Sequence, residues 1–291
     1  MTGPPRSATK PRLRLTGYWL ILPAALWLGL FYVIPFYSLV ATSLFDPEGS
    51  VLTGYEMAWH FANYSAALRD FWQPLVRSLG YAAVATGFCL VLGYTLAYAI
   101  AFKAGRWKYL MLVLVVAPFF TSFLIRTLSW KLILADDGWI VGTLQAVRLL
   151  GENGRLLATP VAVIAGLTYN FLPFMVLPLY ASLEKIDRRL IEAANDLYAS
   201  PVRGFLDVTW PLSLPGVVAG TLLTFIPAAG DYINAQLLGS PNQRMVGNVI
   251  QNLFTTANDY AAAGALSMIL MLIIVTLVLL YVGRSGTEDL G

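Results

Sequence analysis

The chain has 291 residues, of which 58% are hydrophobic and only 12% charged, and its formal net charge is +3. Soluble domains average about 25% charged residues, so this composition excludes an ordinary soluble domain and is typical of a protein solvated by lipid. A single cysteine, Cys89, excludes an internal disulfide and a cysteine metal site, and a single histidine, His60, excludes a histidine-rich metal centre.

Residues 1–14 form a polar segment with four Lys and Arg and no acidic residue. The apolar run that follows is longer than the hydrophobic region of a signal peptide and meets no small-residue cleavage site. We therefore expect this run to stay in the protein as the first membrane span, behind a basic cytoplasmic tail over 1–14.

Six windows along the chain are long and apolar enough to cross a bilayer, which takes about 20 helical residues. The third has a polar outer end, because it contains Arg126 and Lys131. Proline within several windows predicts bent helices, and the short alternating segments of a membrane β-barrel are not visible. The sequence therefore predicts an all-α integral membrane protein with six transmembrane helices. The predicted spans are 15–45, 78–102, 109–134, 156–183, 208–230 and 260–283.

The distribution of Lys and Arg predicts the orientation of these spans. With the N-terminus inside, the inner segments hold twelve Lys and Arg and the outer segments five. Both termini are therefore expected in the cytoplasm, with a transmembrane domain over 15–283 and a second cytoplasmic tail over 284–291. The sequence contains no phosphate loop of the Walker A type, so the energy source is expected in another chain or in an ion gradient.

The loop 184–210, between the fourth and fifth spans, carries the most specific pattern. It predicts a surface helix over 187–199, followed by Ser200 and Pro201 as the N-cap and first-turn residues of a second helix, 201–209. An apolar stripe on one face of the first helix consists of Ile186, Leu190, Ala193 and Leu197. Such a loop is either a solvated helical hairpin or a docking surface for a partner.

Within this loop, the run Glu192-Ala193-Ala194 is followed at fixed spacing by Val208 and Pro211. The pattern resembles the EAA signature of the membrane subunits of ABC importers, in which Glu-Ala-Ala precedes a glycine, a hydrophobic residue and Leu-Pro. The resemblance implies a permease of the type I ABC importer fold, in which the loop 184–210 (the coupling loop) binds an ATPase. The coupling residues that it implies are Glu192, Ala193, Ala194, Tyr198 and Pro211.

Two positions depart from the signature: Tyr198 stands where the family has glycine, and Trp210 where it has leucine. A bulky residue resists the positive φ that glycine adopts freely. We therefore expect either that the turn moves to 199–201 or that Tyr198 takes an ordinary helical conformation.

Segment 63–79 resembles the entry to the permease core of this superfamily, and segments 118–127 and 230–239 resemble its PotB-like spermidine/putrescine permease branch. This resemblance implies a translocation path for a small solute, with polyamines as the expected substrates. Permeases for iron, thiamine or sulfate share much of the pattern and remain alternatives. An ion-coupled transporter or channel is a weaker alternative, because five of the six predicted spans lack ionisable residues.

The resemblance implies no catalytic residue, cofactor or metal site in this chain, since ATP and Mg²⁺ bind to a partner. The implied partners are a second permease subunit (PotC-like), two ATP-binding subunits (PotA-like) and an extracytoplasmic solute-binding protein (PotD-like), in membrane lipid and without nucleic acid. Closure of the ATPase pair would move the helix 187–199 as a rigid lever and rock the spans between inward-open and outward-open states. Glu192 is expected to pair with basic groups on the ATPase; otherwise it is a solvated carboxylate.

Candidates for the substrate path follow from the chemistry of a small cation, which carboxylates and aromatic faces bind. Asp231 is the expected carboxylate, with Tyr232 beside it. Trp130 and Tyr169 are aromatic candidates, although Trp and Tyr also form belts at membrane boundaries. The outer segments hold nine acidic and five basic residues, a net charge of −4 that favours the approach of cations.

Arg126 is expected to have a structural role, because it would repel a cation and because an arginine in a membrane span needs a partner or a watery cavity. Counted along a straight third span, Arg126 reaches the level of Asp231, which predicts an ion pair between the two. Asp136 and Asp137 are expected to form an acidic entry or docking surface.

Overall fold

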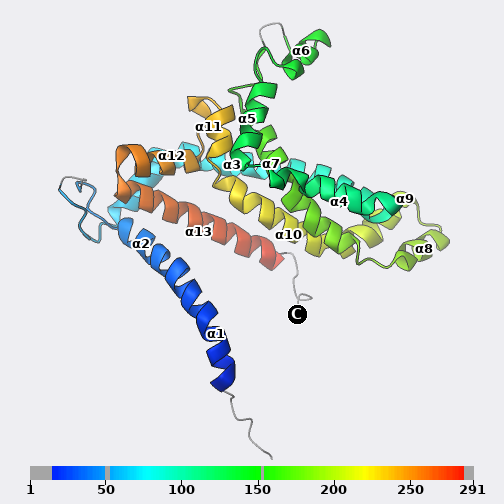
Figure 1. Ribbon diagram of the computed structural model, residues 1–291, viewed down its shortest axis with the longest axis horizontal. Coiled ribbons are helices and arrows are strands. Elements are labelled where there is room, and N and C mark those ends of the chain that lie inside the picture. Colours follow the sequence, from blue (N-terminus) through cyan, green and yellow to red (C-terminus); the bar gives the residue numbers. More distant parts are fainter. Residues whose placement is uncertain (1–14, 50–52, 152–153, 285–291) are drawn as a thin grey trace, which may run out of the picture.

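The computed structural model describes residues 15–49, 53–151 and 154–284, and every regular element in these ranges is a helix (Figure 1). The predicted all-α fold class is therefore confirmed. The tail 1–14 and residues 285–291 of the second predicted tail lie outside the described residues.

The α-helices are α1 (Leu15–Leu28), α2 (Ile34–Thr42), α3 (Ala62–Tyr98), α4 (Lys108–Val116), α5 (Phe123–Ile133), α6 (Trp139–Ala146), α7 (Pro160–Leu183), α8 (Arg188–Asp196), α9 (Pro201–Gly204), α10 (Trp210–Ala229), α11 (Ile233–Leu238), α12 (Val246–Asn252) and α13 (Tyr260–Arg284). Short π-helical or 3₁₀ turns adjoin them: η1 (Gly29–Val33), η2 (Ala99–Lys103), η3 (Gly105–Trp107), η4 (Ala117–Phe120), η5 (Phe205–Thr209), η6 (Pro241–Gln243) and η7 (Leu253–Ala257).

Five helical segments are long and apolar enough to span a membrane, and a sixth span is broken. In the broken span, Gly105–Phe120 and Phe123–Ile133 meet at 95°. The predicted number of six spans is therefore found when the broken pair counts as one. The unbroken spans are Ile21–Thr42, Ala62–Lys103, Pro160–Leu183, Pro201–Ala229 and Tyr260–Arg284.

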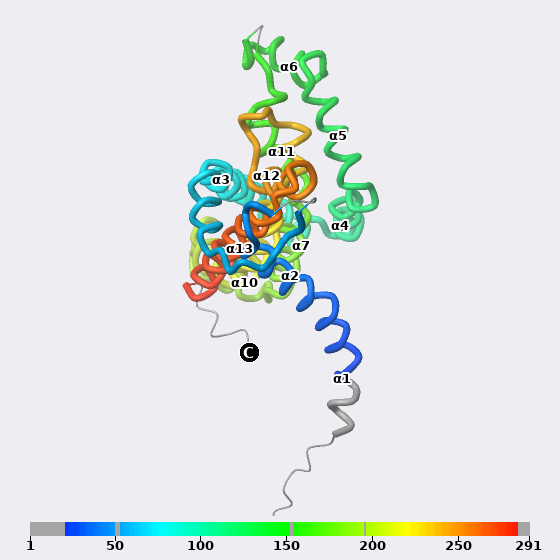
Figure 2. Tube along the Cα trace, turned by 90° about the vertical axis from the view of Figure 1, so that its left-hand side faces the viewer, coloured from blue at the N-terminus to red at the C-terminus, as the bar shows by residue number. Residues whose placement is uncertain are grey.

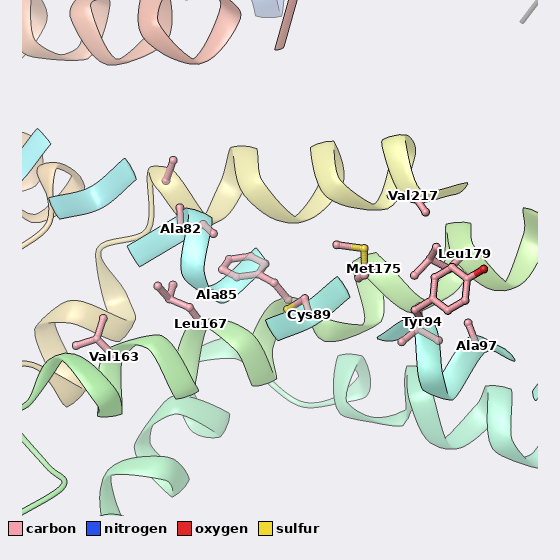
Figure 3. Close-up of a cluster of buried hydrophobic side chains, with 14 of the residues drawn as sticks. Ala82, Ala85, Cys89, Tyr94, Ala97, Val163, Leu167, Met175, Leu179 and Val217 are labelled. Carbon is pink, nitrogen blue, oxygen red and sulfur yellow. The ribbon is translucent and has the colours of Figure 1, made fainter. Parts of the chain in front are cut away.

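Helices α3, α7 and α10 form the centre of the bundle (Figure 3). Apolar side chains from all three fill the space between them, and small residues on α3 allow the helices to come close. The side chains labelled in Figure 3 are Ala82, Ala85, Cys89, Tyr94 and Ala97 of α3, Val163, Leu167, Met175 and Leu179 of α7, and Val217 of α10. A second apolar cluster lies where α13 and α12 contact α3.

Helix α10 approaches α7 through two glycines four residues apart, a spacing that places both on one helix face. A Cβ atom on Gly216 would lie 2.5 Å from the Cβ of Ser182 and 2.8 Å from the carbonyl oxygen of Pro178. A Cβ atom on Gly220 would lie 3.1 Å from the carbonyl oxygen of Met175. The two glycines therefore set the separation of α7 and α10.

The segment after α2 is held firmly against α3 and α13. Asn63 Nδ2 donates to the carbonyl oxygens of Ser43 at 3.1 Å and Phe45 at 2.8 Å. The Ser43 hydroxyl hydrogen-bonds to the Tyr64 hydroxyl at 2.6 Å. The backbone of Ser43 also lies so close to Gly264 that a Cβ atom there would be 2.7 Å from the Ser43 nitrogen. This end of the first span is therefore anchored by both hydrogen bonds and packing.

Helix α1, by contrast, projects away from the bundle (Figures 1 and 2). None of the apolar window of the span Ile21–Thr42 is buried. Large side chains such as Trp27, Phe31 and Tyr32 are more than half exposed. The apolar surface of this span is left for lipid or for another protein.

Helix α3 begins at Ala62, well before the predicted start of the second span at residue 78. The predicted boundary is wrong because Arg77 ends the charge-free window at residue 78, yet the helix continues on the N-terminal side through Arg77, Asp70 and Arg69. A kink at Phe71, with φ −120° and ψ 17°, separates the first part of the helix, which carries Arg69 and Asp70, from the longer second part.

The third span is not a straight helix, which the height count for Arg126 had assumed. After η4, Thr121 and Ser122 are extended, with ψ of 149° and 138°, before α5 begins. Because of this break, a residue count from the start of the span no longer gives the height of a residue in α5. The outer segments 135–155 and 231–259 also contain helices, namely α6, α11 and α12.

Candidate functional site

A buried polar cluster joins α5, α7 and α11. Asn170 Nδ2 donates to Thr127 Oγ1 and to Asn234 Oδ1, each at 3.1 Å. The backbone N–H of Asn234 donates to Asp231 Oδ1 at 2.8 Å. All four side chains are buried. Hydrogen bonds in such a setting have little competition from water, so the cluster fixes α5 and α11 to α7.

Asp231 is the predicted carboxylate of the substrate path, and only 8% of its surface is exposed. Burial raises the pKa of Asp231 to about 6, although the hydrogen bonding of Asn234 to the carboxylate opposes this shift. Tyr232 is 40% exposed, and its carbonyl oxygen accepts a hydrogen bond from Asn248 Nδ2 at 2.7 Å. In this structure Asp231 therefore holds the start of α11 and is not open to a cation.

Arg126 is buried between two aromatic rings, with its guanidinium carbon 5.5 Å from the ring centroids of Phe119 and Phe123. Its Nε and Nη1 atoms have no hydrogen-bond partner among the described residues. The predicted ion pair with Asp231 is wrong, because the break before α5 invalidates the height count that placed the two together. Two ion pairs form in the described ranges: Lys108 with Glu184, and Arg155 with Asp136.

Trp130 and Tyr169, the two aromatic candidates, do lie together. Their rings meet edge to face, with centroids 5.4 Å apart. They line a hollow of about 520 Å³ between α3, α5 and α7, whose other residues are almost all apolar. The four predicted path residues thus fall in two places, an apolar aromatic hollow and the buried polar cluster.

Sequence reasoning missed Asn170 and Asn234, the residues that connect this cluster. Asn170 is the only carboxamide in the predicted span 156–183, and a polar residue inside a membrane span is a functional candidate by default. That signal could have found Asn170. Asn234 lies in a segment that was interpreted as an outer loop, so no comparable signal marked it.

The predicted acidic docking surface at residues 136–137 is partly neutralised. Arg155 Nε lies 3.0 Å from Asp136 Oδ2, and both side chains are more than half exposed. Asp137 is exposed. The docking role of these two residues stays a prediction.

The coupling loop lies at the other end of the bundle, where α7 ends and α10 begins (Figure 1). Arg188 anchors the start of α8, since its Nη2 donates to the carbonyl oxygen of Ala101 at 3.1 Å and its guanidinium lies over the Phe102 ring. Of the predicted apolar stripe, Ile186 is buried. The other members of the stripe are exposed: Leu190, Ala193 and Leu197.

The predicted second helix of the loop begins as expected. Ser200 caps it by accepting a hydrogen bond from the Arg203 N–H at 3.3 Å, and Pro201 occupies the first turn. The helix does not end near 209, because α9, η5 and α10 continue without a break to Ala229. Glu192 is exposed and has no ion-pair partner among the described residues.

Tyr198 contradicts both expectations for its position. Its φ is +61°, so it is in the left-handed conformation, and the turn has not moved to 199–201. The Ala199 N–H donates to the Ala194 carbonyl oxygen at 3.0 Å, which is the bond that closes a helix when its C′ residue is left-handed. Tyr198 therefore keeps the backbone conformation that the family's glycine adopts.

The apolar helices form a bundle with a charged helical loop at one end and a buried polar cluster near the other. These features are those of a multi-pass membrane transport subunit. The chain belongs to the family of binding-protein-dependent transport system inner membrane components, whose sequence model matches residues 51–285. Members of this family are non-catalytic permease subunits of ABC transporters in the cytoplasmic membrane.

Individual relatives agree with this assignment. The chain is 36% identical over 256 residues to the spermidine/putrescine transport system permease protein PotB of Escherichia coli K12, covering 88% of this chain and 92% of that protein. A chain in the crystal structure of a bacterial ABC transporter for alginate import shares the fold, with a TM-score of 0.74, 17% identity and coverage of 94% and 96% of the two chains. The same kind of transporter bound to an alginate-loaded periplasmic protein gives a TM-score of 0.73, 17% identity and 94% coverage of each chain.

Proposed function

We propose that this chain is the permease subunit of an ATP-driven importer for polyamines such as spermidine and putrescine. The observation that carries the proposal is the 36% identity to PotB over 88% of the chain. The acidic excess of the outer segments supports it, since a net charge of −4 attracts cations, although salt screens this attraction beyond about 8 Å.

In this proposal the coupling loop faces the cytoplasm and docks an ATP-binding subunit, which binds ATP and Mg²⁺ and hydrolyses ATP. The bias of Lys and Arg towards the coupling-loop side supports that orientation. Glu192, Ala193, Ala194, Tyr198 and Pro211 form the coupling element. The exposed position of Glu192 leaves it free to pair with basic groups of the ATPase, and the anchoring of Arg188 makes α8 a rigid lever.

A second permease subunit covers the apolar surface of α1 and completes the translocation path between the two subunits. The supporting observation is that none of the apolar window of the span Ile21–Thr42 is buried, and that large aromatic and aliphatic side chains from Ile21 onward are exposed. An extracytoplasmic solute-binding protein delivers the polyamine at the end that carries α11 and α12. Trp130, Tyr169, Asp231 and Tyr232 are the proposed path residues.

The test is uptake of labelled spermidine and putrescine in cells that lack other polyamine importers, with and without this chain. We expect saturable uptake only with the chain, and no competition by excess sulfate, thiamine or ferric iron. Equal polyamine uptake in both strains would refute the substrate. Competition by one of the other solutes would instead assign the permease to that solute.

A further inference from the structure

Tyr198 occupies the position that closes α8. The helix ends at Asp196, and the hydrogen bond from the Ala199 N–H to the Ala194 carbonyl oxygen spans the turn. This closure requires a left-handed residue at position 198, usually glycine because glycine has no Cβ atom to clash. Tyrosine holds the required φ of +61° at a cost in free energy that glycine would not have.

Within the described chain, no contact of the Tyr198 side chain offsets that cost. The Tyr198 side chain is 98% exposed and has no ring or hydrogen-bond contact among the described residues. Residues held in sparsely populated backbone conformations persist where the surroundings compensate, and they cluster at binding and switch sites. A partner that buries the Tyr198 ring would offset the part of this cost that the helix-closing hydrogen bond does not.

The surroundings of Tyr198 indicate what covers it. Leu197 is 82% exposed and Leu190 is 48% exposed. All three residues lie outside the candidate membrane spans, on the coupling loop that the proposed function places in the cytoplasm. They belong to the helical element that Arg188 fixes to the bundle, and they lie beside the Glu192-Ala193-Ala194 run of the coupling loop.

We propose that Tyr198 is a specificity-determining anchor for the ATP-binding subunit. Its ring enters a pocket on that subunit that a permease with glycine at this position would leave empty. Burial of the ring offsets the cost of the left-handed backbone, so the side chain selects the cognate ATPase. This inference rests on the proposed function, because it assumes that the coupling loop docks an ATPase.

The test compares three variants of the permease, assembled with its partner permease in nanodiscs. Tyr198→Gly relieves the strain and removes the ring. Trp59→Gly is the matched control, because Trp59 is also a left-handed aromatic residue, with φ +52° and 63% exposure, in the segment before α3 at the opposite end of the bundle. Leu197→Asp tests docking of the loop itself. Two quantities are measured: the melting temperature and the affinity for the separately purified cognate ATP-binding subunit.

We expect Tyr198→Gly to melt at a higher temperature than wild type and to bind the ATP-binding subunit at least tenfold more weakly. If Tyr198 acted in folding alone, its replacement would change the melting temperature and the affinity in the same direction. A higher melting temperature together with a lower affinity therefore identifies the anchor. Trp59→Gly should show the higher melting temperature without the loss of affinity.

The outcomes distinguish a failure of the Tyr198 anchor from a failure of the docking role of the coupling loop. Wild-type affinity of Tyr198→Gly, together with lost binding by Leu197→Asp, would overturn the anchor and leave the coupling loop intact. Wild-type affinity of Leu197→Asp would overturn the docking role of the loop itself. An equal loss of affinity in Trp59→Gly would also overturn the anchor, because the effect would then not belong to Tyr198.

Discussion

The close approach of α7 and α10 predicts that Gly216→Ala destabilises the bundle. The new Cβ atom would lie 2.5 Å from the Ser182 Cβ and 2.8 Å from the Pro178 carbonyl oxygen, whereas carbon atoms in contact sit about 3.5–4.0 Å apart. The helices must separate by about 1 Å, and overpacking of this kind costs about 1–3 kcal/mol. A loss of this size lowers the melting temperature of a large domain by about 2–10 °C.

Cys89 provides the assay. It is the only cysteine of the chain, it is fully buried between α3 and α7, and its thiol donates to the Thr168 carbonyl oxygen at 3.3 Å (Figure 3). A maleimide dye that fluoresces on reaction therefore reports the temperature at which this core opens.

The matched control for this assay is Gly87→Ala in α3, where a Cβ atom would meet nothing within 4 Å. Alanine is the better helix former, so this variant should melt at or slightly above the wild-type temperature. Identical melting of Gly216→Ala and Gly87→Ala would refute the argument from close approach.

Four further predictions follow from the site and the coupling loop. Burial raises the pKa of Asp231 in the folded state to about 6, so between about pH 4 and 6 the folded state holds a proton that the unfolded state has lost. The free energy of unfolding therefore falls as pH rises through that window. At pH 7 the loss of stability is about 3 kcal/mol. The melting temperature of Asp231→Asn should therefore fall less between pH 5 and 7.5 than that of the wild type. An equal fall in the two proteins would contradict this prediction. Asn170→Leu removes both 3.1 Å hydrogen bonds and leaves the Asn234 oxygen unpaired, which should cost about 1–3 kcal/mol and lower the dye-monitored melting temperature. Ser200→Ala removes a helix cap worth about 1 kcal/mol, so amide exchange in α9 should accelerate while exchange in α13 does not. Glu192→Lys should uncouple ATP hydrolysis from uptake in proteoliposomes, and normal coupled uptake by this variant would show that its docking role is wrong.

Much of the fold was predictable because lipid imposes simple rules on a sequence. Apolar length identified all six spans, and the Ser200-Pro201 pair located a helix start that the structure confirms. The break in the third span was harder to predict. Pro118 lies in η4, and the chain stays helical to Phe120 before the break at Thr121 and Ser122.

The candidate site was less predictable because its contacts are distant in sequence. Asn170 joins residues 43 and 64 positions away along the chain, and no periodicity in a single sequence encodes such a meeting. Tyr198 was mispredicted for a different reason. Intrinsic preference argues against a left-handed tyrosine, but the closure of α8 determined its conformation instead.

The first span acts mechanically as an arm that is fixed at one end. Its 22 residues from Ile21 to Thr42 measure about 33 Å at 1.5 Å per residue. It is attached through the hydrogen-bonded segment around Ser43 and through the contacts of α2 with α13. Beyond those contacts, a bend of about 10° at η1 moves the far end of α1, which has 14 residues, by about 4 Å. The direction of α1 is therefore determined by the lipid or protein that lies against its surface. An isolated subunit in detergent would sweep this arm through a cone, and its outline in solution would narrow only when a neighbour fixes the far end.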